Sequence, residues 1–212
     1  MQLRRSQPIN RFVLKPILFL ILAQAAIDLG IGLILNDLGP DPHERLLHVS
    51  GEWALISLMV TLSVTPLMQW LRWPLLNNLR RMCGLFVAFY ASVHLWVYVQ
   101  FVLDFDWAMI FDELIERPYI TIGFLAWLML LPLAMTSNNY SMRRLGRRWK
   151  KLHRLTYVIA ILGVWHFTWQ VKLDLTEPYI YITILTLLLL WRMRKRIKNS
   201  VLGLLGPSVK NN

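Results

Sequence analysis

Six long apolar segments dominate the sequence, and short polar connections separate them. The segments run roughly over 12–35, 51–70, 82–103, 118–136, 153–171 and 178–193. Their lengths are close to the ~20 residues that an α-helix needs to cross a bilayer, and a helix satisfies its own backbone hydrogen bonds in lipid. We therefore predict an all-α fold: an integral membrane bundle of six transmembrane helices, with residues 1–212 in a single domain. No internal repeat is evident.

The basic residues gather on one side of this predicted bundle. The two termini and alternate connections hold 20 of the 23 Lys and Arg residues, whereas 11 of the 12 Asp and Glu residues lie in or beside the other three connections. The positive-inside rule places the basic side in the cytoplasm. Six crossings agree with this, since they return the chain to its starting side. We expect a multi-pass protein of a bacterial inner membrane with both termini cytoplasmic.

The start of the chain allows a second interpretation. Arg4 and Arg5 precede an apolar run, and Ala23-Gln24-Ala25 is typical of a signal-peptide cleavage site. Apolar sequence continues to Leu35, however, and removing the segment would leave an odd number of helices. We expect this segment to be retained as the first helix.

The composition limits the kinds of partner that this protein is expected to bind. The net charge of +11 would suggest nucleic acid in a soluble protein. Here the charges form short blocks between apolar runs, as expected for topology signals and for affinity toward anionic lipid. We expect contact with membrane lipid and no nucleic-acid binding. Cys83 is the single cysteine, so this chain alone cannot relay electrons as a dithiol.

Two histidines lie inside predicted membrane helices. His94 comes 12 residues after Met82 and His166 comes 13 residues after His153, on two segments that both run outward. At 1.5 Å per residue each lies about 18–20 Å from the cytoplasmic start of its helix. Two imidazoles at one depth can ligate a haem iron from both faces. The alternative is that each histidine only hydrogen-bonds to a neighbouring helix. A zinc site is less expected, because the sequence offers no third ligand at that depth.

His153 stands at the cytoplasmic entrance of the fifth segment. Its spacing from His166 resembles that of stacked haem ligands in transmembrane cytochromes, although 13 residues at 100° leave the two side chains about 140° apart. The position that would supply its partner on the third segment is Arg81. Three interpretations stay open: a haem ligand with a non-histidine partner, a quinone or flavin contact, or an interfacial residue.

Two charged residues near the outer face also have two interpretations each. Asp28, inside the first segment, is either a proton carrier or the partner of a polar residue at the outer mouth. Arg117, at the outer start of the fourth segment, either holds a haem propionate or is an interfacial cation.

Four stretches together resemble one known family over nearly the whole chain. They are LGPDPHERLLHVSGEWAL (38–55), LRRMCGLFVAFYASVHL (79–95), ERPYITIG (116–123) and LGRRWKKLHRLTYVIAILGVWHF (145–167). They resemble the MsrQ family, formerly called YedZ, of haem-binding membrane subunits in the ferric reductase-like transmembrane group. The motifs surround the histidines at matching spacing.

The resemblance implies haem b ligated by His94 and His166, with His153 as a further candidate ligand. His48 also matches a family histidine of less certain role. It further implies that electrons arrive from the quinone pool or a cytoplasmic flavin reductase. They would leave to MsrP, a periplasmic molybdopterin enzyme that repairs methionine sulfoxide in proteins. The chain would then be a non-catalytic electron-transfer subunit. FMN has been associated with the family, although no flavin motif is recognisable here.

Two rival functions use the same histidines without redox chemistry. A proton-coupled transporter would use His94, His166 and Asp28 as a relay. An assembly subunit would use the histidines only for packing.

Overall fold

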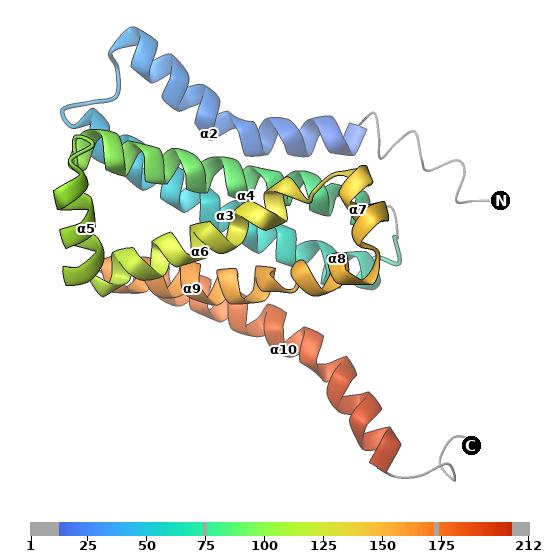
Figure 1. The fold of residues 1–212 in the computed structure, drawn as a ribbon. Coiled ribbons are helices and arrows are strands. Elements are labelled where there is room, and N and C mark those ends of the chain that lie inside the picture. The colour runs from blue at the N-terminus through green and yellow to red at the C-terminus, as the bar shows by residue number, and fades with distance from the viewer. Residues whose placement is uncertain (1–12, 74–75, 172–173, 205–212) are drawn as a thin grey trace.

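Every regular element in the described part of the chain is a helix, so the all-α prediction is confirmed (Figure 1). The computed structural model describes residues 13–73, 76–171 and 174–204, with side chains up to residue 194. The long helices are α2 (Lys15–Leu35), α3 (Pro42–Trp70), α4 (Asn77–Val97), α6 (Pro118–Met135), α9 (Leu155–Gln170) and α10 (Thr176–Leu204). The short ones are α5 (Trp107–Glu116), α7 (Asn139–Leu145) and α8 (Arg147–Leu152). A π-helical turn, Tyr98–Val102, continues α4.

Four helices among the described residues are long and apolar enough to cross a membrane. They are α2, α3, the segment Leu76–Val102 that contains α4, and α6. Of the remaining two, α9 has only 16 residues, and Glu177 and Arg192 bound the apolar part of α10. The basic termini at Arg4, Arg5, Arg11 and Lys210 lie outside the described residues.

The two connections 36–50 and 104–117 contain more helix than we predicted. Helix α3 begins at Pro42 rather than near residue 51, because the Asp41 carboxylate accepts the Glu44 amide at 3.0 Å and caps the helix, while Pro42 suits a first helical position. His43 therefore lies in the first turn of α3, and His48 lies further along the same helix.

The predicted loop 104–117 likewise contains α5. Asp106 caps this helix by accepting the amides of Ala108 and Met109 at 2.9 and 3.3 Å. Figure 1 shows α5 lying across one end of the bundle, where it packs on α6. The end opposite α5 holds α7, α8 and the start of α2 (Figure 1).

Two helix pairs form the centre of the molecule. Helix α3 packs along α4, and α6 packs along α9. The main core lies between these helices and α10, and includes Leu55, Val87, Leu130, Ala160 and Leu185. Large apolar side chains are exposed on the outside of the bundle, especially on α2, as expected for surfaces that face lipid.

Tyr90 joins α2 to the centre of the bundle. Its buried hydroxyl accepts the Ala26 amide at 3.2 Å and donates to the Leu22 carbonyl. In a regular helix that amide and that carbonyl would bond to each other. The hydroxyl is thus inserted into the backbone ladder of α2, which bends midway in Figure 1.

Candidate functional site

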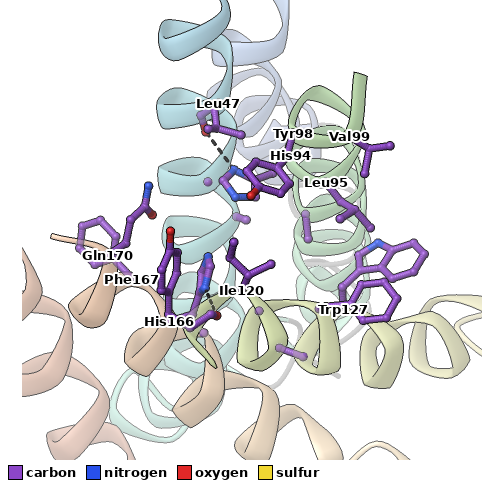
Figure 2. Close-up of a pocket in the computed structure, with 18 of the residues that line it drawn as sticks. Leu47, His94, Leu95, Tyr98, Val99, Ile120, Trp127, His166, Phe167 and Gln170 are labelled. Carbon is purple, nitrogen blue, oxygen red and sulfur yellow. Dashed lines mark hydrogen bonds between the residues drawn. The ribbon is translucent and has the colours of Figure 1, made fainter. Parts of the chain in front are cut away.

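An apolar cavity of about 420 Å³ lies between α3, α4, α6 and α9, toward the end of the bundle that carries α5. His94 from α4 and His166 from α9 both line it (Figure 2). A volume of this size falls within the range of cofactor pockets. The structure therefore brings together the two histidines that we expected to share one depth.

Each histidine turns one ring nitrogen away to a backbone carbonyl. His94 Nδ1 lies 2.9 Å from the Leu47 oxygen, and His166 Nδ1 lies 2.7 Å from the Tyr119 oxygen. A carbonyl can only accept, so Nδ1 carries the proton in both rings and Nε2 keeps a free lone pair. In Figure 2 the other nitrogen of each ring points toward the opposite histidine. This is the tautomer that a metal ligand needs.

The spacing of the two rings fits a shared metal atom. Their centroids are 6.2 Å apart and their planes are at 85°. Two imidazoles on opposite sides of one metal stand about 6.3–6.5 Å apart, given metal–nitrogen distances of about 2.0–2.1 Å. Within the described residues no cluster of three or more His, Cys, Asp or Glu could hold a metal ion. A two-histidine site suits haem, because the porphyrin supplies the other four ligands.

A glycine stands beside each histidine ring. A Cβ on Gly51 would lie 2.9 Å from His94 Nδ1, and a Cβ on Gly123 would lie 2.8 Å from His166 Nδ1. Only glycine leaves room for the rings in their observed positions.

The two halves of the site repeat one another, which corrects our expectation that the chain contains no internal repeat. Leu47 and Tyr119, Gly51 and Gly123, and His94 and His166 are each 72 positions apart. The repeat makes α3 equivalent to α6 and α4 equivalent to α9. Its sequence signal is ERLLHVSG (44–51) against ERPYITIG (116–123), each followed by a histidine 43 positions after its glycine. This weak signal could have identified the carbonyl and glycine positions, which we missed.

The cavity wall follows the same repeat. Further lining residues form pairs at the same separation: Ala54 and Ala126, Leu58 and Leu130, Val87 and Ile159, Ala91 and Gly163, Leu95 and Phe167, and Tyr98 and Gln170. Small residues recur close to the histidines, and larger aliphatic ones recur deeper in the bundle. Two similar walls thus face each other across the cavity.

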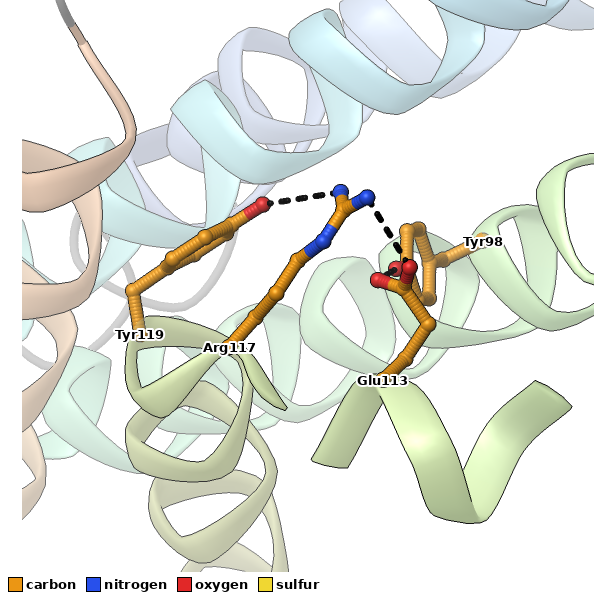
Figure 3. A network of polar contacts seen from close by, with 4 residues as sticks. All are labelled: Tyr98, Glu113, Arg117 and Tyr119. Atoms are coloured by element: carbon orange, nitrogen blue, oxygen red, sulfur yellow. Dashed lines mark hydrogen bonds and ion pairs between the residues drawn. The ribbon is translucent and has the colours of Figure 1, made fainter. Parts of the chain in front are cut away.

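A polar network links three residues that line the α5 end of the cavity, Tyr98, Glu113 and Tyr119, to Arg117 (Figure 3). The Tyr98 hydroxyl donates to Glu113 at 2.8 Å, and the same carboxylate forms an ion pair with Arg117 at 3.0 Å. Arg117 also lies 3.5 Å from the Tyr119 hydroxyl. The hydrogen bond with Tyr119 and the Glu113 charge raise the pKa of Arg117, so it stays cationic. The charge of Arg117 is therefore balanced by Glu113 at the α5 end of the cavity.

The other candidate residues lie outside the cavity. His48 is exposed on α3. His153 follows α8; its ring stacks on Trp149 at 3.9 Å, and its Nε2 lies 3.2 Å from the Thr136 hydroxyl. Asp28 is exposed on α2 and is not among the residues that line the cavity with the two paired histidines. A proton relay that links Asp28 to His94 and His166 is therefore not supported by their positions.

Comparison with known proteins gives a consistent relationship. The model of the family described as "Ferric reductase like transmembrane component" matches residues 50–164. A protein of Xanthomonas campestris pv. campestris is 51% identical over 160 residues, which cover 76% of this chain and 73% of that protein. One from Herminiimonas arsenicoxydans is 42% identical over 182 residues, covering 82% and 84%.

Both relatives bear the name protein-methionine-sulfoxide reductase heme-binding subunit MsrQ. No solved structure matches the chain significantly. The resemblance seen in the motifs around the histidines is thus confirmed over about three quarters of the sequence or more. The chain belongs to the ferric reductase-like transmembrane family and, within it, to the MsrQ family.

Proposed function

We propose that this protein is a haem b electron-transfer subunit of a methionine sulfoxide reductase system in a bacterial inner membrane. The observation that carries the proposal is the pairing of His94 and His166, whose Nε2 atoms face each other in an apolar cavity. The names of the relatives support it, since they describe haem-binding subunits of such a system.

A haem bound here supplies the one-electron chemistry, and the chain supplies its environment. His94 and His166 would hold its iron, and the carbonyls of Leu47 and Tyr119 fix the tautomers of the two rings. The apolar walls exclude water from the site, and this exclusion helps to set the redox potential of the haem. Arg117 is a candidate for a propionate, to which it would turn from Glu113.

We propose six membrane crossings with both termini cytoplasmic. The two crossings beyond the four apolar helices would be α9, which packs along α6, and α10, which packs on α3 and α9. The basic connection that contains α7 and α8 lies at the end of the bundle opposite α5. The charge distribution then assigns that end to the cytoplasm and α5 to the periplasm.

Electrons would enter at the cytoplasmic end and leave near α5. The proposed donors are the quinone pool or a cytoplasmic flavin reductase, and the proposed acceptor is MsrP. The histidine pair lies toward the α5 end, and α5 exposes Trp107 and Phe111 beside Asp112 and Glu116. Exposed aromatics among acidic groups can steer and anchor a soluble partner.

The cytoplasmic end has groups that suit an anionic second cofactor. Arg192 donates to the Leu62 carbonyl at 3.0 Å and to the Tyr157 hydroxyl, and its buried Nε has no hydrogen-bond partner among the described residues. Arg80 is close enough to interact with it electrostatically. The family resemblance associates FMN with such proteins, and the phosphate of an FMN would bind favourably to these two guanidinium groups. His153 serves in this proposal as a contact on the electron-entry side rather than as an assigned haem ligand.

Two measurements test the function in sequence. Purified protein should show a reducible Soret band, which a transporter or assembly subunit would lack. Mixing the pre-reduced protein with oxidised MsrP and a methionine sulfoxide substrate should then re-oxidise the haem. If the haem stays reduced with both present, the assignment to this repair system fails while the cytochrome assignment survives.

A further inference from the structure

The carbonyls that hold His94 and His166 are each followed by a glycine one helical turn later. Gly51 comes four residues after Leu47 on α3, and Gly123 comes four residues after Tyr119 on α6. In an α-helix the carbonyl of residue i points toward residue i+4. A side chain at i+4 therefore stands over the carbonyl and obstructs a group that approaches it from a neighbouring helix.

The distances show how little space remains. A Cβ at either glycine would lie under 3.0 Å from the Nδ1 atom of the adjacent histidine, which is far inside ordinary contact. Gly84 on α4 offers a contrast, because a Cβ there would meet nothing within 4 Å. A Cβ at Gly32 on α2 would also be too close to its neighbour, but there the neighbour is the end of the Leu38 side chain, so Gly51 and Gly123 are the two described glycines whose space is taken by a histidine ring.

We propose that Gly51 and Gly123 are positioning residues for the two axial ligands. Each glycine lets an imidazole reach the helix backbone, and the hydrogen bond formed there fixes the direction of Nε2 and the electron density that it offers the iron. The inference rests on the haem site proposed above. Its basis is that the same carbonyl, glycine and histidine recur in both halves of the repeat with the same contacts.

The proposal predicts an effect opposite to that of helix propensity. Alanine is the better helix former, so replacing a glycine whose space is not needed should leave the protein as stable or more stable. At Gly51 and Gly123 the added methyl group should push the ring from its carbonyl instead. A weaker hydrogen bond at Nδ1 makes the imidazole a poorer donor, which favours the ferrous state and raises the midpoint potential.

The experiment compares Gly51→Ala and Gly123→Ala with Gly84→Ala in purified haem-loaded protein. The measurements are the optical spectrum, the electron paramagnetic resonance of the ferric haem, the midpoint potential and the melting temperature. Both site variants should shift the resonance and raise the potential, or lose haem while the fold persists. Gly84→Ala should match the parent in spectrum and potential and melt at the same or a higher temperature. Site variants with the parent's spectrum and potential would overturn the proposal.

If Gly51→Ala does not accumulate, the same substitution in a protein that lacks the His94 ring shows whether the clash with that ring is the cause. In His94→Ala the new methyl group has no ring to meet, so Gly51→Ala/His94→Ala should accumulate as well as His94→Ala alone. A double variant that still fails would exclude the ring as the cause and refute the positioning role. If His94→Ala keeps the full haem signal, it is the haem site itself that is wrong.

Discussion

His94 and His166 face each other across one cavity, with ring centroids 6.2 Å apart and ring planes at 85°. The two side chains come from different helices, α4 and α9, and each is fixed by a carbonyl 47 residues earlier in the chain. One iron atom between them would depend on both.

Removing either ligand should abolish the same signal. His94→Ala and His166→Ala should each lose nearly all of the low-spin haem spectrum, and the double variant should lose little more, because the two effects are not independent. Haem content and the optical spectrum of purified protein measure this. Partial losses of different size, with distinct spectra, would mean that the two histidines serve different sites.

The proposed topology can be mapped with reporter fusions. Fusions after residues 40, 108 and 175 should report the periplasm, and fusions after 75, 145 and 200 should report the cytoplasm. The fusions after 145 and 175 are the most informative, since they flank α9, which is only 16 residues long. A periplasmic signal after residue 145 would contradict six crossings.

His153 should affect electron entry more than the haem itself. It lies outside the cavity, against Trp149 and the Thr136 hydroxyl. We expect His153→Ala to slow haem reduction by the donor several-fold while the spectrum of the haem between His94 and His166 stays unchanged. Stopped-flow reduction measures the rate. Thr136→Val is the matched control, because it removes the contact and keeps the imidazole. Unchanged kinetics in His153→Ala would leave the residue as an interfacial group.

Charge reversal on α5 should slow transfer to the acceptor. Asp112 and Glu116 are exposed, whereas Asp106 caps the helix and should be spared. Asp112→Lys/Glu116→Lys should reduce the rate of haem re-oxidation by MsrP several-fold and weaken its dependence on salt, with an intact spectrum. Glu177→Lys, at the start of α10, is the control. Equal slowing in both proteins would argue against α5 as the docking surface.

The Tyr90 hydroxyl should stabilise the join between α2 and α4. Tyr90→Phe removes two hydrogen bonds, but the Ala26 amide and the Leu22 carbonyl can then bond to each other. We therefore expect a loss of only about 0.6–1.5 kcal/mol, measured as a lower unfolding temperature in detergent. Tyr179→Phe, at an exposed position, should have no effect. A loss above about 3 kcal/mol would mean that the α2 ladder does not re-form.

Features that depend on one helix or on a short stretch of sequence were predictable from the sequence. The helical rise placed His94 and His166 at one depth, because 12 or 13 residues from a helix start correspond to one height whatever the neighbours are. The apolar runs and the one-sided charges depend only on composition along the chain, and they indicated a membrane bundle. The resemblance around the histidines identified the family because motif spacing is preserved in the sequence.

Rotation about each helix axis and contact between helices were decided only by the tertiary structure. His153 is at the right height for a second site, but its ring points to Thr136 and Trp149, which its sequence position does not reveal. The carbonyls of Leu47 and Tyr119 are backbone groups that every residue carries; the weak repeat marks their positions, but it does not reveal that they bind a histidine. Gly51 and Gly123 acquire their meaning only when an imidazole from another helix arrives beside them. Depth follows from the geometry of one helix, whereas a binding site requires several helices to present their faces to the same space.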